Sequence, residues 1–240
     1  MHMPIILKNR NPNLIEWMDR DDCDKELLFN TYAQFDRINK LLSGWDRIYS
    51  RYIKPHLSKS EANPDQPFTI LDIGCGGGDI IRFLNTLCTN DGFHVLFTGI
   101  DPDTRALDFS HQSAQPTNIQ FFSERSDELV RENRTFDIVI SNHLMHHLSP
   151  DELIAICNDA SALAKIGVVF SDIERSDLGY FAFQMIAPLL FRKSYIVQDG
   201  LTSIKKSYRK KELMGQLPHG WSVERKFPFR LLAIYNRTLI

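Results

Sequence analysis

Apolar and polar positions change their period along the chain, and this change divides it into two parts. From Leu27 to Tyr52 apolar residues recur close to the 3.6-residue period of an amphipathic helix, and Pro55 is expected to end this helical part. Residues 58–67 are polar, contain two prolines and have no period, which predicts a linker. We therefore expect residues 1–57 to form an N-terminal helical extension and residues 68–240 to form a separate domain.

In the second part, short apolar runs alternate with amphipathic segments. The pattern predicts strands at 68–73, 94–100, 118–123, 136–141 and 166–172, and helices near 78–89, 103–113, 126–132, 150–164 and 176–191. Such alternation indicates an α/β fold with a parallel sheet, whose ligands bind at the carboxyl ends of the strands. After a predicted helix at 209–216, two β-prone runs lie too close together for a parallel crossover, so they are expected to pair antiparallel. These runs are Trp221–Phe227 and Leu231–Tyr235.

The first predicted strand leads into a glycine-rich loop, which is the most informative segment of the chain. Gly74, Gly76 and Gly78 permit positive φ angles and let the main chain approach a ligand closely. The helix that follows would present free N–H donors to the same ligand. The dinucleotide fingerprint G-x-G-x-x-G would require a third glycine where Asp79 stands. From Asp72 to Gly78 the chain has D-x-G-x-G-x-G instead.

An acidic cluster follows the second predicted strand. Asp101-Pro102-Asp103 begins 23 residues after Gly78. In nucleotide-binding α/β folds a carboxylate at this place accepts hydrogen bonds from ribose hydroxyls. Asp101 could instead cap the next helix with Pro102 at its first position, and Asp101 and Asp103 could also divide the two roles.

The fourth predicted strand carries a second motif. Residues 136–148 follow the pattern F-D-x-V…N-x-x-x-H-H-L, which places Asn142 and three histidines after a strand buried on both faces. Together with the loop from Asp72 to Gly78, this segment resembles the class I S-adenosylmethionine (SAM)-dependent methyltransferases that act on small molecules. The resemblance implies a three-layer, Rossmann-like fold with a seven-stranded, mostly parallel sheet and an antiparallel last strand. It also implies SAM as the cofactor and S-adenosylhomocysteine (SAH) as its product.

The resemblance assigns cofactor binding to residues in four loops. They are Asp72, Gly74, Cys75, Gly76, Gly78, Asp101, Pro102, Ser126 and Asn142. The chain departs from the family after the third strand, where many relatives carry an aspartate that binds the adenine amino group and this chain has Arg125. Arginine cannot accept that hydrogen bond, so the contact is expected to fall to Ser126, Asp127 or backbone atoms.

The three histidines of the second motif are candidates for different roles. His143 and His146 are spaced to share one face of a helical turn near the sulfonium. An imidazole takes up a proton near neutral pH, so His146 is the first candidate for a general base and His143 the second. His147 is expected to be structural. A His-x-x-His pair could also be half of a metal site, but the sequence offers no convincing third ligand and no metal is expected.

Composition fits a soluble enzyme of the cytoplasm. With 28 basic and 30 acidic residues the formal charge is −2, so nucleic acid is not an expected partner. The four cysteines are far apart and form no C-x-x-C pair, which argues against a zinc site and disulfides and favours a reducing compartment. The most apolar stretch, residues 181–191, is far shorter than the ~20 residues that cross a bilayer, so no membrane partner is expected. Monomer and homodimer both remain open.

These observations predict methyl transfer from SAM to a small-molecule acceptor. The segments at Met18–Gly44 and 192–203 resemble a subgroup of the family associated with quinone and polyketide-like products. The resemblance favours a phenolic or enolic oxygen as the acceptor. A nitrogen or carbon acceptor, a catalytically silent SAM-binding or SAM-sensing protein, and a nicotinamide-dependent oxidoreductase remain alternatives.

Two segments are expected to shape the substrate side of the site. The front helices, interrupted at Ser43-Gly44, should close over it as a lid with Trp45, Tyr49 and Tyr52. An insertion at about 176–208 should also lie there, with residues 181–191 either lining an apolar pocket or packing on the core.

Overall fold

A computed structural model describes residues 6–60, 67–112 and 115–237, without the side chains of 36–42 and 60. Most of the expected linker, residues 61–66, lies outside the described residues. Within the described residues no helix is both long and apolar enough to cross a membrane.

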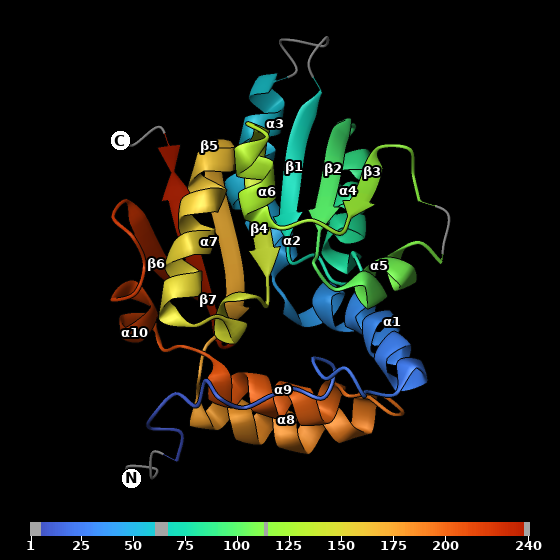
Figure 1. Cartoon of the computed structure of the whole chain (residues 1–240), viewed down its shortest axis with the longest axis vertical. Helices are drawn as coiled ribbons and strands as arrows, with labels where there is room; N and C mark the ends of the chain where they lie inside the picture. Colours follow the sequence, from blue (N-terminus) through green and yellow to red (C-terminus); the bar gives the residue numbers. More distant parts are fainter. Residues whose placement is uncertain (1–5, 61–66, 113–114, 238–240) are drawn as a thin grey trace.

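A seven-stranded sheet forms the centre of the structure (Figure 1). Its strand order is β3-β2-β1-β4-β5-β7-β6, in which the first five strands pair in parallel and β7 lies antiparallel between β5 and β6. The bounds are Phe68–Ile73 (β1), Val95–Ile100 (β2), Ile119–Phe122 (β3), Phe136–Asn142 (β4), Ala164–Ile173 (β5), Trp221–Lys226 (β6) and Arg230–Asn236 (β7). The predicted fold class and the antiparallel final pair are confirmed.

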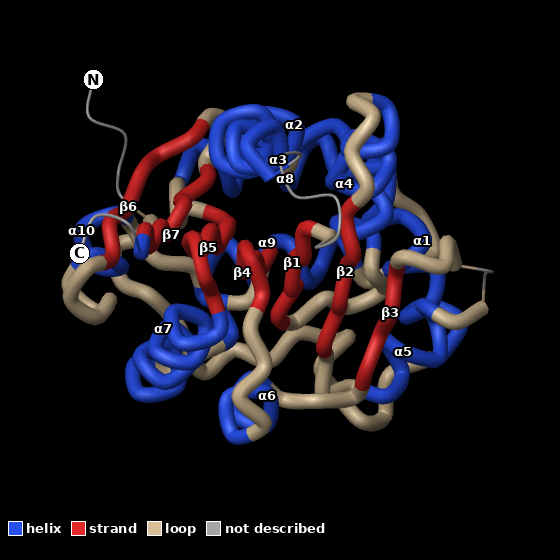
Figure 2. Tube along the Cα trace, turned by 90° about the horizontal axis from the view of Figure 1, so that it is seen from above, coloured by secondary structure: helices blue, strands red, loops and turns tan. Residues whose placement is uncertain are grey.

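Helices cover both faces of the sheet (Figure 2). One apolar cluster joins the sheet to α4 (Asp79–Asn90) and to the helices before β1, and a second joins the other face to α6 (Ser126–Arg131) and α7 (Pro150–Leu163). The short α5 (Thr104–Ser110) follows β2 near the β3 edge. Helices therefore bury both faces of the sheet, and only the ends of the strands are open to a ligand.

The N-terminal helices differ from the expectation at one point. They are α1 (Lys25–Leu42), α2 (Trp45–Ile48), a π-helical turn (Tyr49–Ile53) and α3 (Lys54–Ser60). Gly44, with φ 68°, separates α1 from α2 as expected, but the expectation that Pro55 ends the helix is wrong. Pro55 lies in the first turn of α3, where a proline is tolerated because its missing N–H is not needed. The turn before it is a wider π turn, in which the Lys54 N–H donates to the Tyr49 carbonyl.

The insertion after β5 forms two packed helices at the carboxyl ends of the strands (Figure 1). These are α8 (Asp177–Leu190) and α9 (Ile196–Lys206), followed by α10 (Lys210–Met214). A Cβ at Gly200 would lie 2.5 Å from the ring of Phe183, so the glycine permits the close approach of the two helices.

Residues 6–24, called here the N-terminal segment, run across α8 and α9 (Figure 1). Asp177 accepts hydrogen bonds from the N–H groups of Ile6 and Leu7. Asp199 accepts from the N–H groups of Trp17 and Met18 at 2.7 and 3.0 Å. These carboxylates tie the N-terminal segment to the insertion and place its side chains against the strand ends.

Candidate active site

A cavity of about 380 Å³ lies where β1, β2 and β4 end. Its floor is made by the loops that follow these strands, and its cover by the N-terminal segment, α1 and the α8–α9 pair. Lining residues from the strand loops are Asp72, Gly74–Gly77, Asp79, Asp101, Asp103, Asn142–Leu144, His146 and His147. Lining residues from the cover include Glu16, Asp19, Tyr32, Phe35, Phe183, Ile196, Asp199 and Ser203.

The glycine loop has the backbone conformation that its sequence predicts. Gly74, Gly76 and Gly78 have φ of 71°, 51° and 78°. Asp101 fixes the loop from β2, because its Oδ2 accepts the Gly76 N–H at 2.9 Å while its Oδ1 accepts the Asp103 N–H at 2.9 Å. Asp101 therefore joins the two loops on which a nucleoside would lie.

Carboxylates concentrate at this end of the cavity. Asp72 is 1 % exposed, and its Oδ1 has no hydrogen-bond partner among the described residues. Burial, and then the charges of Asp79 and Asp101, raise the pKa of Asp72 well above its ordinary value. A cationic ligand at this point would relieve that repulsion. SAM carries an ammonium and a sulfonium, so the carboxylates and the glycine loop fit it.

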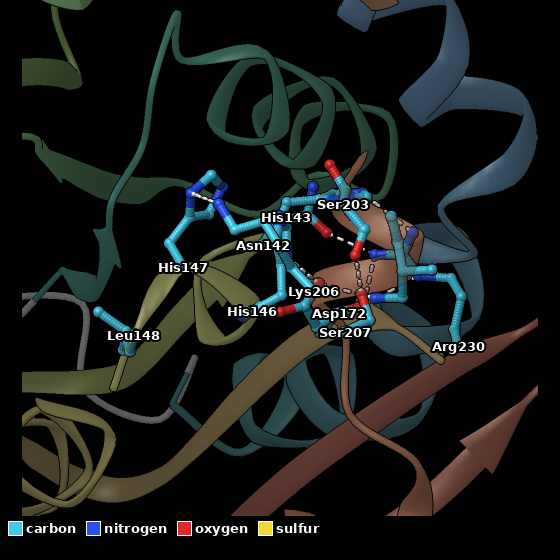
Figure 3. A network of polar contacts seen from close by, with 12 residues as sticks. Asn142, His143, His146, His147, Leu148, Asp172, Ser203, Lys206, Ser207 and Arg230 are labelled. Carbon is cyan, nitrogen blue, oxygen red and sulfur yellow. Dashed lines mark hydrogen bonds and ion pairs between the residues drawn. The ribbon is translucent and has the colours of Figure 1, made fainter. Parts of the chain in front are cut away.

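Asn142 and His143, at the end of β4, are both held by Arg230 of β7 (Figure 3). Asn142 Oδ1 accepts from Arg230 Nη2 at 2.7 Å and from Trp45 Nε1 at 3.1 Å. His143 Nε2 accepts from Arg230 Nη1 at 3.1 Å. Burial and the Arg230 charge lower the pKa of His143 to about 3, so its imidazole is neutral at physiological pH.

His146 lies between two carboxylates. Its Nδ1 is 2.7 Å from Asp172 Oδ1, and its Nε2 is 3.3 Å from Glu16 Oε1. Burial alone would lower the pKa of His146, but the Asp172 and Glu16 carboxylates outweigh it and raise the pKa to about 9. The imidazole is therefore charged at neutral pH and has no free lone pair, which conflicts with the general-base role expected for it.

His147 lies closer to the open cavity than the sequence suggested. Its side chain is 27 % exposed, and its Nδ1 accepts from Lys206 Nζ at 3.1 Å. Lys206 is itself buried and lies 3.3 Å from Glu16 Oε1. Glu16 and Lys206 were missed by sequence reasoning because no motif marks them. Glu16 belongs to the N-terminal segment and Lys206 to α9. Both segments are far from the β4 loop in the sequence and lie beside it only in the folded chain.

Comparison with known proteins agrees with this geometry. A sequence model of the methyltransferase domain family matches residues 70–167, which span the glycine loop, Asp101 and the β4 motif. Residues 70–167 form a methyltransferase domain. The cofactor of this family is SAM, which the carboxylate-rich end of the cavity fits.

Two curated relatives match about three fifths of this chain. The ubiquinone biosynthesis O-methyltransferase of Colwellia psychrerythraea (strain 34H / ATCC BAA-681) is 31 % identical over 152 residues, covering 61 % of this chain and 57 % of the relative. The enzyme of the same name from Pelagibacter ubique (strain HTCC1062) is 24 % identical over 153 residues, covering 61 % of each chain. Each match therefore spans less than two thirds of the relative's length.

Solved structures of methyltransferases share the fold. The plantazolicin methyltransferase BamL, in complex with a substrate analogue and SAH, superimposes with a TM-score of 0.51 at 20 % identity, over 83 % of this chain and 76 % of that one. The plantazolicin methyltransferase BpumL, in complex with SAH, gives 0.53 at 12 % identity, over 88 % of this chain and 96 % of that one.

The methyltransferase domain divides the roles of its two β2-loop aspartates. Asp103 is the N-cap of α5, accepting from the Arg105 N–H at 2.9 Å, so the alternative that Asp101 caps the helix is wrong. Asp101 faces the cavity. Pro102, expected to contact the cofactor, is exposed and does not line the cavity.

Ser126 and Asp127, expected to replace the adenine-binding aspartate, do not line the cavity. Ser126 does not line the cavity, and its hydroxyl donates to Asp159 Oδ2 of α7 at 2.6 Å. Asp127 pairs with Arg131 and Arg125 on the surface. This geometry conflicts with the expected cofactor role of Ser126, because its one donor is used to join α6 to α7.

Replacing Ser126 with alanine is accordingly expected to leave SAH affinity within about twofold of the wild type. It should lower the free energy of unfolding by about 1 kcal/mol through the lost hydrogen bond to Asp159. Calorimetric titration with SAH and denaturant unfolding measure the two effects. A tenfold loss of SAH affinity in a stably folded variant would show that Ser126 contacts the cofactor.

The aromatic residues expected in a lid do not cover the cavity. Trp45 and Tyr49 are buried in the core beside α4, and Tyr52 packs against the same cluster. Tyr32 and Phe35 of α1 line the cavity instead. Of the insertion, Phe183 lines the cavity, whereas Met185 and Leu189 on the outer face of α8 are 74 % and 75 % exposed.

The β4 loop also contains the ligand types of a metal site. Glu16, His146 and His147 form one cluster and His143, His146 and Asp172 another, each with its ligand atoms within 4.8 Å. The third ligand that the sequence did not reveal therefore exists in space. However, Lys206 lies 3.3 Å from Glu16, and Arg230 lies 3.1 Å from His143 Nε2. A bound cation would be repelled by both.

Proposed function

We propose that this protein transfers the methyl group of SAM to a small-molecule acceptor. The observation that carries the proposal is a single cavity with two chemically different ends. One end has the glycine loop, Asp72 and Asp101, and the other has the β4-loop histidines beside apolar side chains. A cofactor at the first end would direct its reactive group toward an acceptor at the second.

The favoured acceptor is a phenolic or enolic oxygen of an aromatic or polyketide-like molecule. Phe35, Phe183 and Ile196 give the second end apolar walls that suit a flat ring. Both curated relatives are O-methyltransferases of ubiquinone biosynthesis, whose names support an oxygen acceptor.

The residues of the chain would act mainly by positioning. SAM supplies a methyl group that its sulfonium already activates. Asp101 and the glycine loop would hold the nucleoside, and the N-terminal segment and α9 would exclude water from the other end. Alignment of this kind contributes up to ~7–11 kcal/mol to lowering a barrier. His143 and His146 are proposed as the catalytic residues that face the acceptor, with His146 as a charged donor and not as a base.

We also infer that the N-terminal extension, residues 1–57, acts as a cover over a domain formed by residues 68–240. Its support is the contribution of Glu16, Asp19, Tyr32 and Phe35 to the cavity wall. A cytoplasmic location is inferred as well, because the four cysteines are free thiols in the structure.

Release of SAH from SAM in the presence of a panel of phenols, enols, amines and activated carbon acids tests the proposed function. Turnover with phenols or enols is expected. Turnover confined to amines or carbon acids would change the acceptor class. SAM binding without SAH release across the panel would indicate a silent SAM-binding protein.

Replacing His146 with glutamine should lower turnover by ~10²-fold, the usual cost of removing one donor from a charge-stabilising site. SAM affinity should stay within about twofold, because His146 lies beyond the glycine loop. The exposed His219→Gln variant is the matched control and should keep full turnover. Unchanged turnover of His146→Gln on the best acceptor of the panel would remove His146 from the mechanism.

A further inference from the structure

Four polar side chains from the end of β4 and the loop that follows it line the cavity, and we call Asn142, His143, His146 and His147 the donor wall. Two of them have their acceptor atoms occupied by Arg230. The Asn142 Oδ1 and the His143 Nε2 each receive a guanidinium N–H. An arginine can only donate, so the atoms left for a ligand are the Asn142 NH₂ group and the Nδ1–H of neutral His143.

Lys206 has the same effect on His147. Its ammonium donates to His147 Nδ1 at 3.1 Å, so the N–H of this ring is on Nε2. Asp19 Oδ2 lies equally close to Nδ1, at 3.1 Å, but only the Lys206 contact has the alignment of a hydrogen bond. His147 therefore has its donor on Nε2, at the cavity wall and 3.8 Å from Glu16 Oε1.

His146 adds a donor that has no aligned partner. Its Nδ1 is bonded to Asp172, and its Nε2 faces Glu16 at 3.3 Å outside hydrogen-bond geometry. The side chain is 2 % exposed. Glu16 pairs with this N–H by charge without an aligned hydrogen bond, and an oxygen acceptor in the cavity would supply that bond.

Positive and negative groups alternate behind the donor wall, and the positive ones contact its side chains directly. Arg230, Lys206 and His146 supply three positive charges, against two from Asp172 and Glu16. Two further carboxylates face this end of the cavity from the cover. Asp199 is bonded to the N–H groups of Trp17 and Met18, and Asp19 lies 3.8 Å from Lys206. The remaining acidic residues belong to the cofactor end.

We propose that the donor wall binds an ionised oxygen of the acceptor, an enolate or phenolate, so that the acceptor reacts as a preformed anion and no residue serves as a general base. This inference rests on the proposed function and narrows its substrate class to acidic enols and phenols. A lone pair of the oxyanion forms the new O–C bond while the C–S bond breaks and its electron pair stays on sulfur. The negative and positive charges cancel, the products are the methyl ether and SAH, and no proton is released in the transfer step.

The test uses 4-nitrophenol, whose absorption spectrum reports its ionisation, added to protein saturated with SAH. The pKa of the bound phenol is expected to fall by about one unit or more, which is about tenfold tighter binding of phenolate than of phenol. An unchanged or raised pKa of the bound phenol would overturn the inference and indicate a site that holds a base.

Two variants assign the effect to the donor wall. Asn142→Asp replaces the NH₂ donor with a carboxylate oxygen at nearly constant shape, and Lys206→Met removes the charge behind His147. Both should abolish the shift, while the exposed matched controls Asn158→Asp and Arg225→Gln should keep it. A shift retained in Asn142→Asp would contradict the inference even if Lys206→Met does not fold.

Titration with SAH before the phenol is added separates the two proposals. A protein that fails to bind SAH would contradict the proposed function, whereas SAH binding without the shift would contradict only this inference.

Discussion

Replacing Asp101 with alanine is expected to lower the affinity for SAH by roughly 100-fold. The carboxylate holds the Gly76 and Asp103 N–H groups at 2.9 Å and is proposed to accept hydrogen bonds from the ribose. A hydrogen bond to a charged group contributes about 1.5–3 kcal/mol, and a loss of about 3 kcal/mol corresponds to that change in affinity. Calorimetric titration with SAH measures it directly.

The control for this substitution is Asp127→Ala, in the first turn of α6. The Asp127 side chain is half-exposed and pairs with the surface residues Arg125 and Arg131, so its removal should leave SAH binding unchanged. SAH binding of wild-type strength in Asp101→Ala would show that the ribose is held elsewhere. An equal loss in both variants would point to general destabilisation.

Replacing Asp172 with asparagine is expected to lower the free energy of unfolding by about 3 kcal/mol at pH 7. It removes the ion pair of a buried, charged His146, and a broken buried pair costs about 3–5 kcal/mol. Denaturant unfolding of the variant and the wild type gives the difference. The exposed Asp108→Asn control should differ from the wild type by less than about 0.5 kcal/mol.

The His146–Asp172 pair also makes the difference in free energy of unfolding between the wild type and Asp172→Asn depend on pH. The pKa of His146 in the folded protein, about 9, is above its ordinary value of 6.5, so its stabilising contribution is complete below pH 6.5 and is lost as the pH rises through about 9. The pKa of Asp172 is lowered, so its contribution is present above its ordinary value of 3.8 and is lost in acid. The difference in free energy of unfolding between the wild type and Asp172→Asn should therefore become smaller above pH 9. A difference that stays unchanged from pH 7 to above pH 9 would show that His146 is already neutral at pH 7.

The features that could be predicted from the sequence are those that local patterns control. The β1 glycine loop, the β2 aspartates and the β4 motif follow buried strands, and the sheet brings the ends of neighbouring strands together without further information. The antiparallel β6–β7 pair follows from a connection too short for a crossover.

The roles of the histidines could not be predicted in this way. Whether an imidazole is charged depends on what lies within a few ångströms, and the partners of His146 are Asp172 on β5 and Glu16 in the N-terminal segment. Lys206, which donates to His147, lies on α9, an amphipathic helix that was missing from the prediction. These contacts join residues that are far apart in the sequence.

The cavity at the ends of β1, β2 and β4 is proposed to be a SAM site and not a dinucleotide site. Calorimetric titration of the wild-type protein with SAM, SAH and NAD tests it most directly. One molecule of SAM or SAH is expected to bind per chain, and NAD is expected not to compete. Saturable binding of NAD without binding of SAM or SAH would contradict the account.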